Sequence, residues 1–559
     1  MSIRVTVAAL GLLVGLGAPG TGQLVTPAMA RDSLTIGISQ FPPSLHPGID
    51  PLVIKAYVDA FVTRPMTAYD AHWTLQCMLC TKLPTIENGG AVFETLPDGK
   101  RGIAVTFTLK PDLKWGDGVP VTSKDIVFTW KVGGDPKSGY SIPHPWERAK
   151  SVEVVDDRTV IFHLDHIDTS YNNWSQLLPE HLEAEAAKGE NAGDYGKASL
   201  YARQPTNPGL YNGPYIVTSY ETSAQIVLEA NPYWPGPKPA LKRIVLRDIE
   251  NTAALQANLE SGDVDMTPGE GVGLSIDQVI AMEKKEPEKF VYLYKPSLTY
   301  EHIDLQSGNP LLSDVRVRRA LLLAIDRQTL VSKLFEGKQP VAASWVNPLD
   351  GNYTKDTANY PYDPTKAKAL LKEAGWTPGS DGICRNAKGE KLQLEITTTA
   401  GNKLRELTEQ VLISQWKSSC IAVAVKNEQA RTFFGETMRK RLYSGMAMYA
   451  WSSNVDESPR RTLHSSQAPT EANGWGGANY IAFANPQMDT DIATVEGELD
   501  AAKRRPVWAE MQRIYADQVP VLPLFFRAEP YALPKWLKGF VATGHGDYSP
   551  LWAENWRAE

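Results

Sequence analysis

The chain has 559 residues, of which 42% are hydrophobic and 22% are charged, and its formal net charge at pH 7 is −7. This length is too great for a single hydrophobic core, so we expect two or three domains. A mildly acidic chain without basic runs is a poor candidate for binding nucleic acid, which requires a basic face.

The first residues have the pattern of a secretory signal peptide. Arg4 supplies the positive charge, an apolar run covers residues 5–16, and Ala28-Met29-Ala30 is typical of a cleavage site. The run is too short to span a membrane; the alternative is a buried N-terminal helix. We therefore expect residues 1–30 to be removed and the protein to be periplasmic. No cysteine lies near the cleavage point, and a bacterial lipid anchor needs one, so we expect no lipid anchor.

The four cysteines are Cys77, Cys80, Cys384 and Cys420. An even number in an oxidising compartment favours disulfides, whereas a single CxxC motif is a weak signal for zinc. For Cys77 and Cys80, a local bond and two free thiols both stay open. Cys384 and Cys420 flank a predicted strand–helix–strand unit and could bridge the ends of two neighbouring strands.

The first half of the chain is rich in predicted strands. Alternating or apolar runs predict strands at 34–39 and 104–109, a hairpin at 152–164 and three strands after residue 213. A helix is expected from about residue 51 to 61. Thr122 and Asp125 have the spacing of a capping box, which predicts the start of another helix. A further helix at 252–260 has an asparagine N-cap and a glycine after its end.

Beyond Tyr300 the pattern changes to alternating helices and strands. Ser313 or Asp314 caps one helix, and Asp363-Pro364 begins another that Gly375 closes. Strand 392–398, helix 403–417 and strand 421–425 form a βαβ unit, which predicts parallel pairing and an α/β domain. The tail adds a helix after residue 501 and the apolar strand VPVLPLFF. Two lobes joined by more than one crossover predict a binding site between them.

Several segments, taken in order, resemble the extracytoplasmic solute-binding proteins of ABC importers, in family 5, the dipeptide- and oligopeptide-binding family. They are VTFTLKPDLKWGDGVPVTSKDIVFTW, GPYIVTSYETSAQIVLEANPYWPGPKPALKRIVLRDI, SGDVDM, SDVRVRRALLLAIDRQTLV, YDPTKAKALLKEAGW and NYIAFANPQMDTDI. The resemblance covers nearly all of the mature chain. It implies an α/β fold of the two-lobed periplasmic binding protein type, in a large version with hinge-linked mixed sheets.

The resemblance also implies a division of the chain into lobes. The core of lobe I would contain residues 31–75, 200–298 and 515–559, with residues 76–199 as an inserted subdomain, and lobe II would contain residues 299–514. Ligand would be enclosed as the lobes close, and the closed form would dock on the ABC permease subunits at the inner membrane.

The resemblance makes a peptide the default ligand, with an oligosaccharide, an opine or a chelated metal as alternatives. A monomer without a cofactor is expected. A sensor with the same fold and a secreted hydrolase are the other functions considered. A hydrolase would need a nucleophile and a base, and we find neither an HExxH nor a G-x-S-x-G motif in the sequence. We therefore predict no catalytic residues.

The stretch YAWSSNVDESPRRTLHSS, residues 449–466, is the candidate ligand-binding segment. Peptide-binding relatives have a similar Trp-x-x-Asp pattern, in which the Asp is similar to a counter-ion for the α-amino group of a peptide. Aligning Trp451 with that Trp puts Asn454 in the place of the Asp, and an Asn carries no charge. Asp456 could substitute if the segment is extended, because residues 454 and 456 would then lie on one side. The alternative is that Asn454 caps a turn and Asp456 is solvated.

The predicted ligand-binding set combines this stretch with aromatic residues elsewhere. Arg460 and Arg461 could hold a ligand carboxylate, although ion pairs within the protein are the favoured interpretation. The predicted ligand-binding residues are Phe41, Tyr449, Trp451, Asn454, Asp456 and Trp475.

Overall fold

The computed structural model describes residues 31–559 except 50–51, 97–98, 136–137, 140–145, 189–194, 250, 270–271 and 474. The predicted signal peptide therefore lies outside the described residues. Within the described part of the chain, no helix combines the length and the apolar content that crossing a bilayer requires.

The first lobe is built on a four-stranded mixed sheet in the order β1-β10-β9-β8. Its strands are β1 (Ser33–Ile38), β8 (Tyr215–Glu221), β9 (Gln225–Ala230) and β10 (Arg243–Asp248). β1 pairs in parallel with β10, and the other pairs are antiparallel. Helix α1 (Val53–Val62) contributes to the buried core beside this sheet. The predicted strands of this region are confirmed.

A second antiparallel sheet forms the inserted subdomain, in the order β4-β5-β7-β6. It contains β4 (Ala91–Thr95), β5 (Arg101–Thr108), β6 (Ala149–Val154) and β7 (Thr159–Leu164), so the predicted hairpin is confirmed. Helix α2 (Ser123–Gly133) begins with the predicted capping box. The short hairpin of β2 (Thr67–Tyr69) and β3 (Leu75–Cys77) connects this subdomain with the core of the first lobe.

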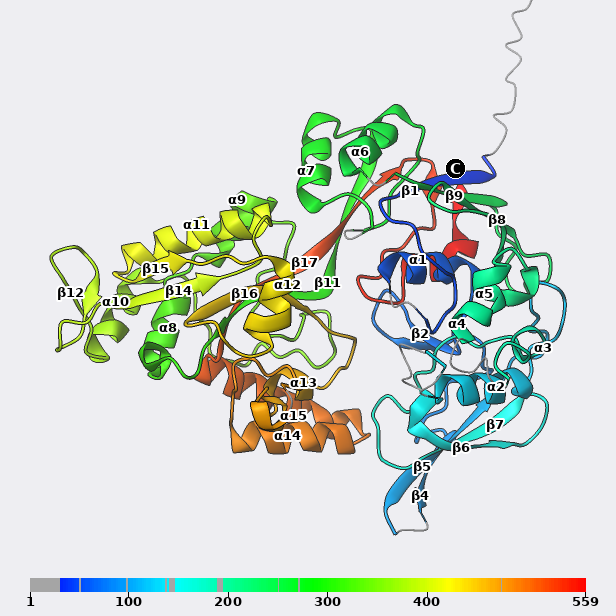
Figure 1. Ribbon diagram of the computed structural model, residues 1–559, viewed down its shortest axis with the longest axis horizontal. Coiled ribbons are helices and arrows are strands. Elements are labelled where there is room, and N and C mark those ends of the chain that lie inside the picture. The colour runs from blue at the N-terminus through cyan, green and yellow to red at the C-terminus, as the bar shows by residue number, and fades with distance from the viewer. Residues whose placement is uncertain are drawn as a thin grey trace, which may run out of the picture.

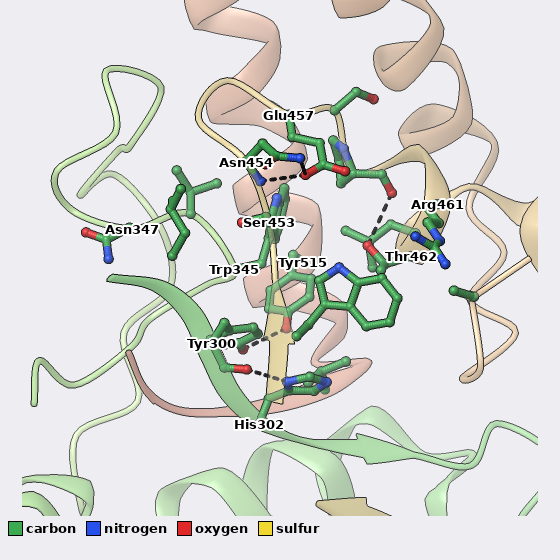
Figure 2. A pocket seen from close by; sticks show the side chains of 18 of the residues that line it. Tyr300, His302, Trp345, Asn347, Ser453, Asn454, Glu457, Arg461, Thr462 and Tyr515 are labelled. Carbon is green, nitrogen blue, oxygen red and sulfur yellow. Dashed lines mark hydrogen bonds between the residues drawn. The ribbon is translucent and has the colours of Figure 1, made fainter. Parts of the chain in front are cut away.

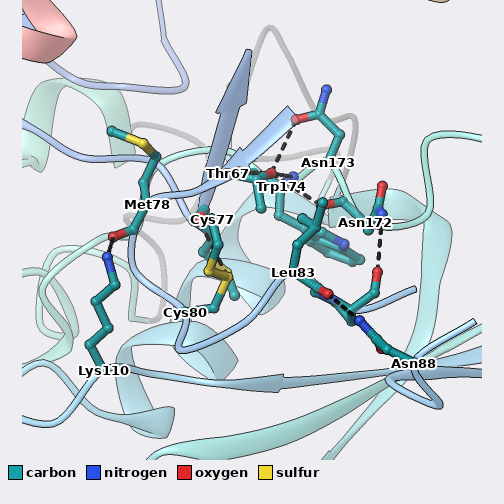
Figure 3. Close-up of a disulfide and its surroundings, with 12 residues drawn as sticks. Thr67, Cys77, Met78, Cys80, Leu83, Asn88, Lys110, Asn172, Asn173 and Trp174 are labelled. Atoms are coloured by element: carbon teal, nitrogen blue, oxygen red, sulfur yellow. Dashed lines mark hydrogen bonds between the residues drawn. A yellow bond between two sulfur atoms is a disulfide. The ribbon is translucent and has the colours of Figure 1, made fainter. Parts of the chain in front are cut away.

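Each cysteine has a partner in the structure. Cys77 and Cys80 form a disulfide with a Cα–Cα distance of 5.4 Å, in the loop where Lys110 Nζ donates to the Met78 carbonyl oxygen at 2.8 Å (Figure 3). Cys384 and Cys420 form the second disulfide, with a Cα–Cα distance of 5.1 Å. Both distances lie within the range usual for disulfides.

The second lobe contains a five-stranded sheet in the order β15-β14-β16-β11-β17. Helix α11 (Lys403–Ser418) connects β14 to β15, and these two strands are parallel, so the predicted βαβ unit is confirmed. β14 and β16 are also parallel, whereas β11 is antiparallel to both β16 and β17. The strands are β11 (Phe290–Leu305), β14 (Gln393–Thr397), β15 (Ala422–Val425), β16 (Met446–Ser452) and β17 (Val521–Pro534).

Helices pack around this sheet and beside the connection between the lobes. The predicted caps are confirmed: Asn251 caps α6, Asp314 caps α8 and Asp363 caps α10, and Gly375 has the left-handed conformation expected after a helix end. The helices are α6 (Thr252–Ser261), α7 (Ile276–Lys285), α8 (Val315–Leu323), α9 (Arg327–Phe335), α10 (Pro364–Glu373), α13 (Arg460–Leu463), α14 (Pro486–Gly497) and α15 (Ala501–Gln518).

Strands β11 and β17 run as an antiparallel pair from one lobe to the other (Figure 1). At one end of β17, Leu533 belongs to the core of the first lobe, and at the other end Leu522 belongs to the core of the second. The pairing register shifts between Pro296 and Tyr300. An irregularity in a two-stranded connection is a suitable place for a hinge. The residue boundaries suggested for the lobes stay predictions.

Candidate functional site

The floor of the main pocket comes from β11 and β16. Side chains alternate between the two faces of a strand, so Tyr300, His302 and Asp304 share one face of β11. Trp451 lies opposite Tyr300, and Tyr449 lies opposite His302. All five residues line the same pocket, so the antiparallel register collects three aromatic side chains, a histidine and a carboxylate in one place.

The walls of this pocket come from loops and helices of the second lobe. Figure 2 shows Tyr300 and His302 at one end, Trp345 and Tyr515 between, and Asn454, Glu457 and Arg461 toward the other end. The volume open to the centre of a water molecule is about 70 Å³. A single water needs roughly 10–15 Å³ on this measure, so the space fits a side chain and not a whole peptide.

Polar atoms of the pocket floor are paired with one another. Tyr449 Oη donates to Asp304 Oδ2 at 2.7 Å, and His302 Nε2 lies 3.3 Å from Asp304 Oδ1. His302 Nδ1 lies 3.0 Å from the Tyr300 carbonyl oxygen, and the hydroxyls of Tyr300 and Tyr515 are 3.0 Å apart. Burial, reinforced by Asp304, raises the pKa of Tyr449 well above its ordinary value. The floor therefore offers a ligand mainly aromatic surface.

Three predicted site residues, Tyr449, Trp451 and Asn454, line this pocket together. The backbone N–H and the side-chain Nδ2 of Asn454 both donate to Glu457 Oε2, at 2.6 and 3.2 Å. The Asn454 amide thus closes a local turn. The structure shows where these residues lie; their binding of ligand stays a prediction.

Asp456 lies outside the lining of the pocket. Its φ of 56° puts it in the left-handed region, at a turn and not in an extended segment. The condition for residues 454 and 456 to share a side, an extended segment, is not met, because the chain turns at residues 455 and 456. Asn352 Nδ2 donates to Asp456 Oδ1 at 2.7 Å, and Arg504 Nη2 donates to Asp456 Oδ2 at 3.0 Å.

The remaining predicted residues, Phe41 and Trp475, also lie away from this pocket. Phe41 makes an edge contact with Tyr220, with ring centroids 5.1 Å apart, at the border of the first-lobe core. Trp475 is half-buried in its glycine-rich loop, where its backbone N–H donates to the Thr470 carbonyl oxygen. Either residue could contact a ligand only if part of that ligand extended from the pocket into the space between the lobes.

The two adjacent arginines have different surroundings. Arg460 pairs with Glu496 on α14, with Nε–Oε2 and Nη2–Oε2 distances of 2.7 and 2.6 Å. This is the ion pair within the protein that we favoured. Arg461 lines the pocket, and its Cζ lies 5.2 Å from the centroid of the Trp451 ring. A cation at this distance from an indole makes a cation–π contact.

The pocket borders the first lobe. Burial first, and then the charges of Asp456, Asp547 and Asp350, raise the pKa of Tyr69, which lies in β2 of the first lobe. Asp350 is a pocket residue. Leu499, between α14 and α15, packs against the core of the inserted subdomain. A ligand in the pocket would therefore lie where the two lobes approach each other.

The sequence reasoning missed the contribution of β11. Tyr300, His302 and Asp304 alternate along the strand with Glu301 and Ile303, but both sets mix polar and apolar residues. The segment TYEHIDL therefore carries no strict period of two that could have identified it. Nothing in the sequence showed that β16 would lie beside it. Among the described residues, no cluster of three or more His, Cys, Asp or Glu side chains is arranged to hold a metal ion.

Comparisons with known proteins agree with this architecture. The chain matches the family described as bacterial extracellular solute-binding proteins, family 5 Middle, over residues 94–473. The oligopeptide-binding protein AppA of Bacillus subtilis (strain 168) is 28% identical over 459 residues, which are 80% of each chain.

Solved two-lobed structures have a similar fold. The oligopeptide binding protein from Thermus thermophilus, complexed with pentapeptide, has a TM-score of 0.67 and 28% identity, covering 94% of this chain and 96% of that one. NikZ from Campylobacter jejuni, in complex with Ni(L-His), has a TM-score of 0.69 and 22% identity, covering 94% and 99% of the two chains. The second likeness concerns the fold alone.

Proposed function

Because the chain belongs to the bacterial extracellular solute-binding proteins of family 5, we propose that it captures a peptide between its two lobes and delivers it to an ABC importer. Two similar proteins support the choice of ligand: one is named an oligopeptide-binding protein, and the other was solved with a pentapeptide. Ligand contacts made by both lobes exist only when the lobes are closed, so ligand shifts the population toward the closed form.

The observation that carries the proposal is the aromatic pocket where the second lobe approaches the first. Its volume of about 70 Å³ is suited to one side chain of a larger ligand. The remaining part of that ligand would lie between the lobes. A paired-strand connection with an irregular register allows the lobes to move relative to each other.

The proposal places the protein in the periplasm, as a monomer without a lipid anchor. Its partners would be the permease subunits at the inner membrane, which would recognise the closed form. The function is binding without turnover, and it requires no cofactor of the protein.

A non-peptide solute is the second candidate, and one observation favours it. The Asn454 amide is already bonded to Glu457, and by the family resemblance Asn454 would take the place of a charged anchor for an amine. An oligosaccharide, an opine or a chelated metal would not need that anchor. A chelate would bring its own metal ligands, as the bound species named for NikZ does.

The experiment that tests the proposal identifies the solute directly. Native mass spectrometry of the protein purified from its host should detect a co-purified peptide. In a thermal-shift assay, peptide pools should raise the Tm of the protein, since ligand at a hundredfold excess over Kd stabilises the folded form by about 2.7 kcal/mol. A Tm that rises with opines, oligosaccharides or nickel–histidine and with no peptide pool would refute the peptide proposal.

A further inference from the structure

The charged side chains of the pocket differ in whether they have hydrogen-bond or ion-pair partners within the protein. Asp304 is 3% exposed, and each of its oxygens lies near a partner, Tyr449 or His302. Glu457 receives two N–H donors from Asn454. Asp350, the third carboxylate of the lining, accepts the backbone N–H of Asn352 at 2.8 Å. All three carboxylates therefore already accept hydrogen bonds within the protein, and none is a dedicated counter-ion for a ligand ammonium.

Arg461 is the exception among the charged residues of this pocket. Its neighbour Arg460 is occupied by Glu496, whereas no ion pair or side-chain hydrogen bond to Arg461 is found among the described residues. The Arg461 side chain is exposed and lies over the Trp451 ring. Stacking on an indole orients a guanidinium and leaves the N–H groups at its edge available.

A stacked arginine has a clear chemical preference. Its planar group presents paired N–H donors that match the two oxygens of a carboxylate, and such charge-assisted pairs are stronger than neutral hydrogen bonds. The aromatic floor lies in the same pocket, formed in part by Tyr300 and Tyr449. The pocket thus combines a surface for an apolar or aromatic group with one available cation.

We propose that Arg461 binds a carboxylate of the ligand, and that an apolar or aromatic side chain next to this carboxylate enters the pocket. The proposal rests on the peptide-binding function proposed above and specifies which end of the peptide this region recognises. The carboxyl terminus would be held here. The uncharged Asn454 agrees with this polarity, because the amine would not need an anchor at this point.

The test compares chemically blocked peptides on matched variants. Pools of tripeptides to pentapeptides with an aromatic C-terminal residue are prepared as free acids, as C-terminal amides and as N-acetylated acids, and Kd is measured by calorimetry. Wild type should bind the free acids and the N-acetylated acids with similar Kd. The amides should bind roughly 10- to 100-fold more weakly, the effect of losing a hydrogen-bonded charge.

Variants assign that difference to one residue. Arg461→Gln should bind the free acids roughly 10- to 100-fold more weakly and should no longer distinguish acids from amides. Arg460→Gln is the matched control, because it removes the neighbouring charge, and it should bind like wild type. Circular dichroism and Tm without ligand confirm that both variants fold.

Two results would overturn the proposal while leaving the peptide function intact. One is binding that N-acetylation abolishes and amidation leaves unchanged. The other is an Arg461→Gln variant with the Kd of wild type, or an Arg460→Gln variant that loses as much affinity as Arg461→Gln. A wild-type protein that binds none of these pools, although general peptide pools raise its Tm, would also overturn the assignment of Arg461. A protein whose Tm no peptide pool raises would instead overturn the peptide function, and the assignment of Arg461 would fall with it.

Discussion

The contact between the lobes at Leu499 provides a direct test of closure. Leu499 is half-buried and packs against the core of the inserted subdomain, although it lies between two helices of the second lobe. Truncating a fully buried leucine to alanine costs about 2–5 kcal/mol, and a half-buried contact on a surface that can relax should cost about 1 kcal/mol. Leu499→Ala should remove this stabilisation from the closed form alone.

A loss of about 1 kcal/mol from the closed form should raise the Kd of the ligand about fivefold. The full effect applies when the unliganded protein is mostly open, and calorimetry on the variant and on wild type measures the Kd. Leu442→Ala is the control, because Leu442 is 61% exposed in the same lobe. If Leu499→Ala and Leu442→Ala bind ligand equally well, the contact does not contribute to closure and the reasoning is refuted.

Three further predictions concern the stability of the second lobe. Replacing both Cys384 and Cys420 with serine opens a loop with a sequence separation of 36, and the chain-entropy relation gives a loss of about 4 kcal/mol in the free energy of unfolding, measured by denaturant titration. An unchanged midpoint would contradict it. Burial raises the pKa of Glu409 from 4.5 to about 7, so this group makes the folded state lose stability as pH rises through that interval. Glu409→Gln should remove this decline. If the denaturant midpoint falls between pH 5 and pH 8 by the same amount in wild type and in Glu409→Gln, the prediction is refuted. Glu301 is buried between two arginines, including Arg405 at 2.6 Å, so Glu301→Gln should cost about 3–5 kcal/mol, and a cost below 1 kcal/mol by denaturant titration would count against it.

Local signals in the sequence predicted much of the fold, for physical reasons. The capping box of α2, the N-cap of α6 and the glycine after α10 act within a few residues, so their geometry is encoded in short patterns. The βαβ unit could be predicted because parallel strands require a crossover, and the helix between them supplies it. The pairing of β11 with β16 could not, because no short pattern specifies which distant strands become neighbours.

The candidate site shows the same division between local and distant information. The family pattern led to Trp451 and Asn454, which the structure places in one pocket. The family pattern could not show that Arg460 forms an ion pair within the protein while Arg461 lines the pocket. The difference between them depends on Glu496, which lies 36 residues beyond Arg460 and reaches it through the packing of α14.

Asp456 connects these observations. Its left-handed backbone turns the chain after Asn454, and Arg504 and Asn352 hold its carboxylate in place. This reversal lets α13 return Arg461 to the face of Trp451, ten positions earlier in the sequence. Asp456, an acid two residues after Asn454, therefore contributes to the shape of the site. The pocket lining holds three carboxylates, Asp304, Asp350 and Glu457, which accept hydrogen bonds within the protein. Its guanidinium, Arg461, has no ion pair among the described residues, which is why the ligand is better tested for its carboxylate than for its amine.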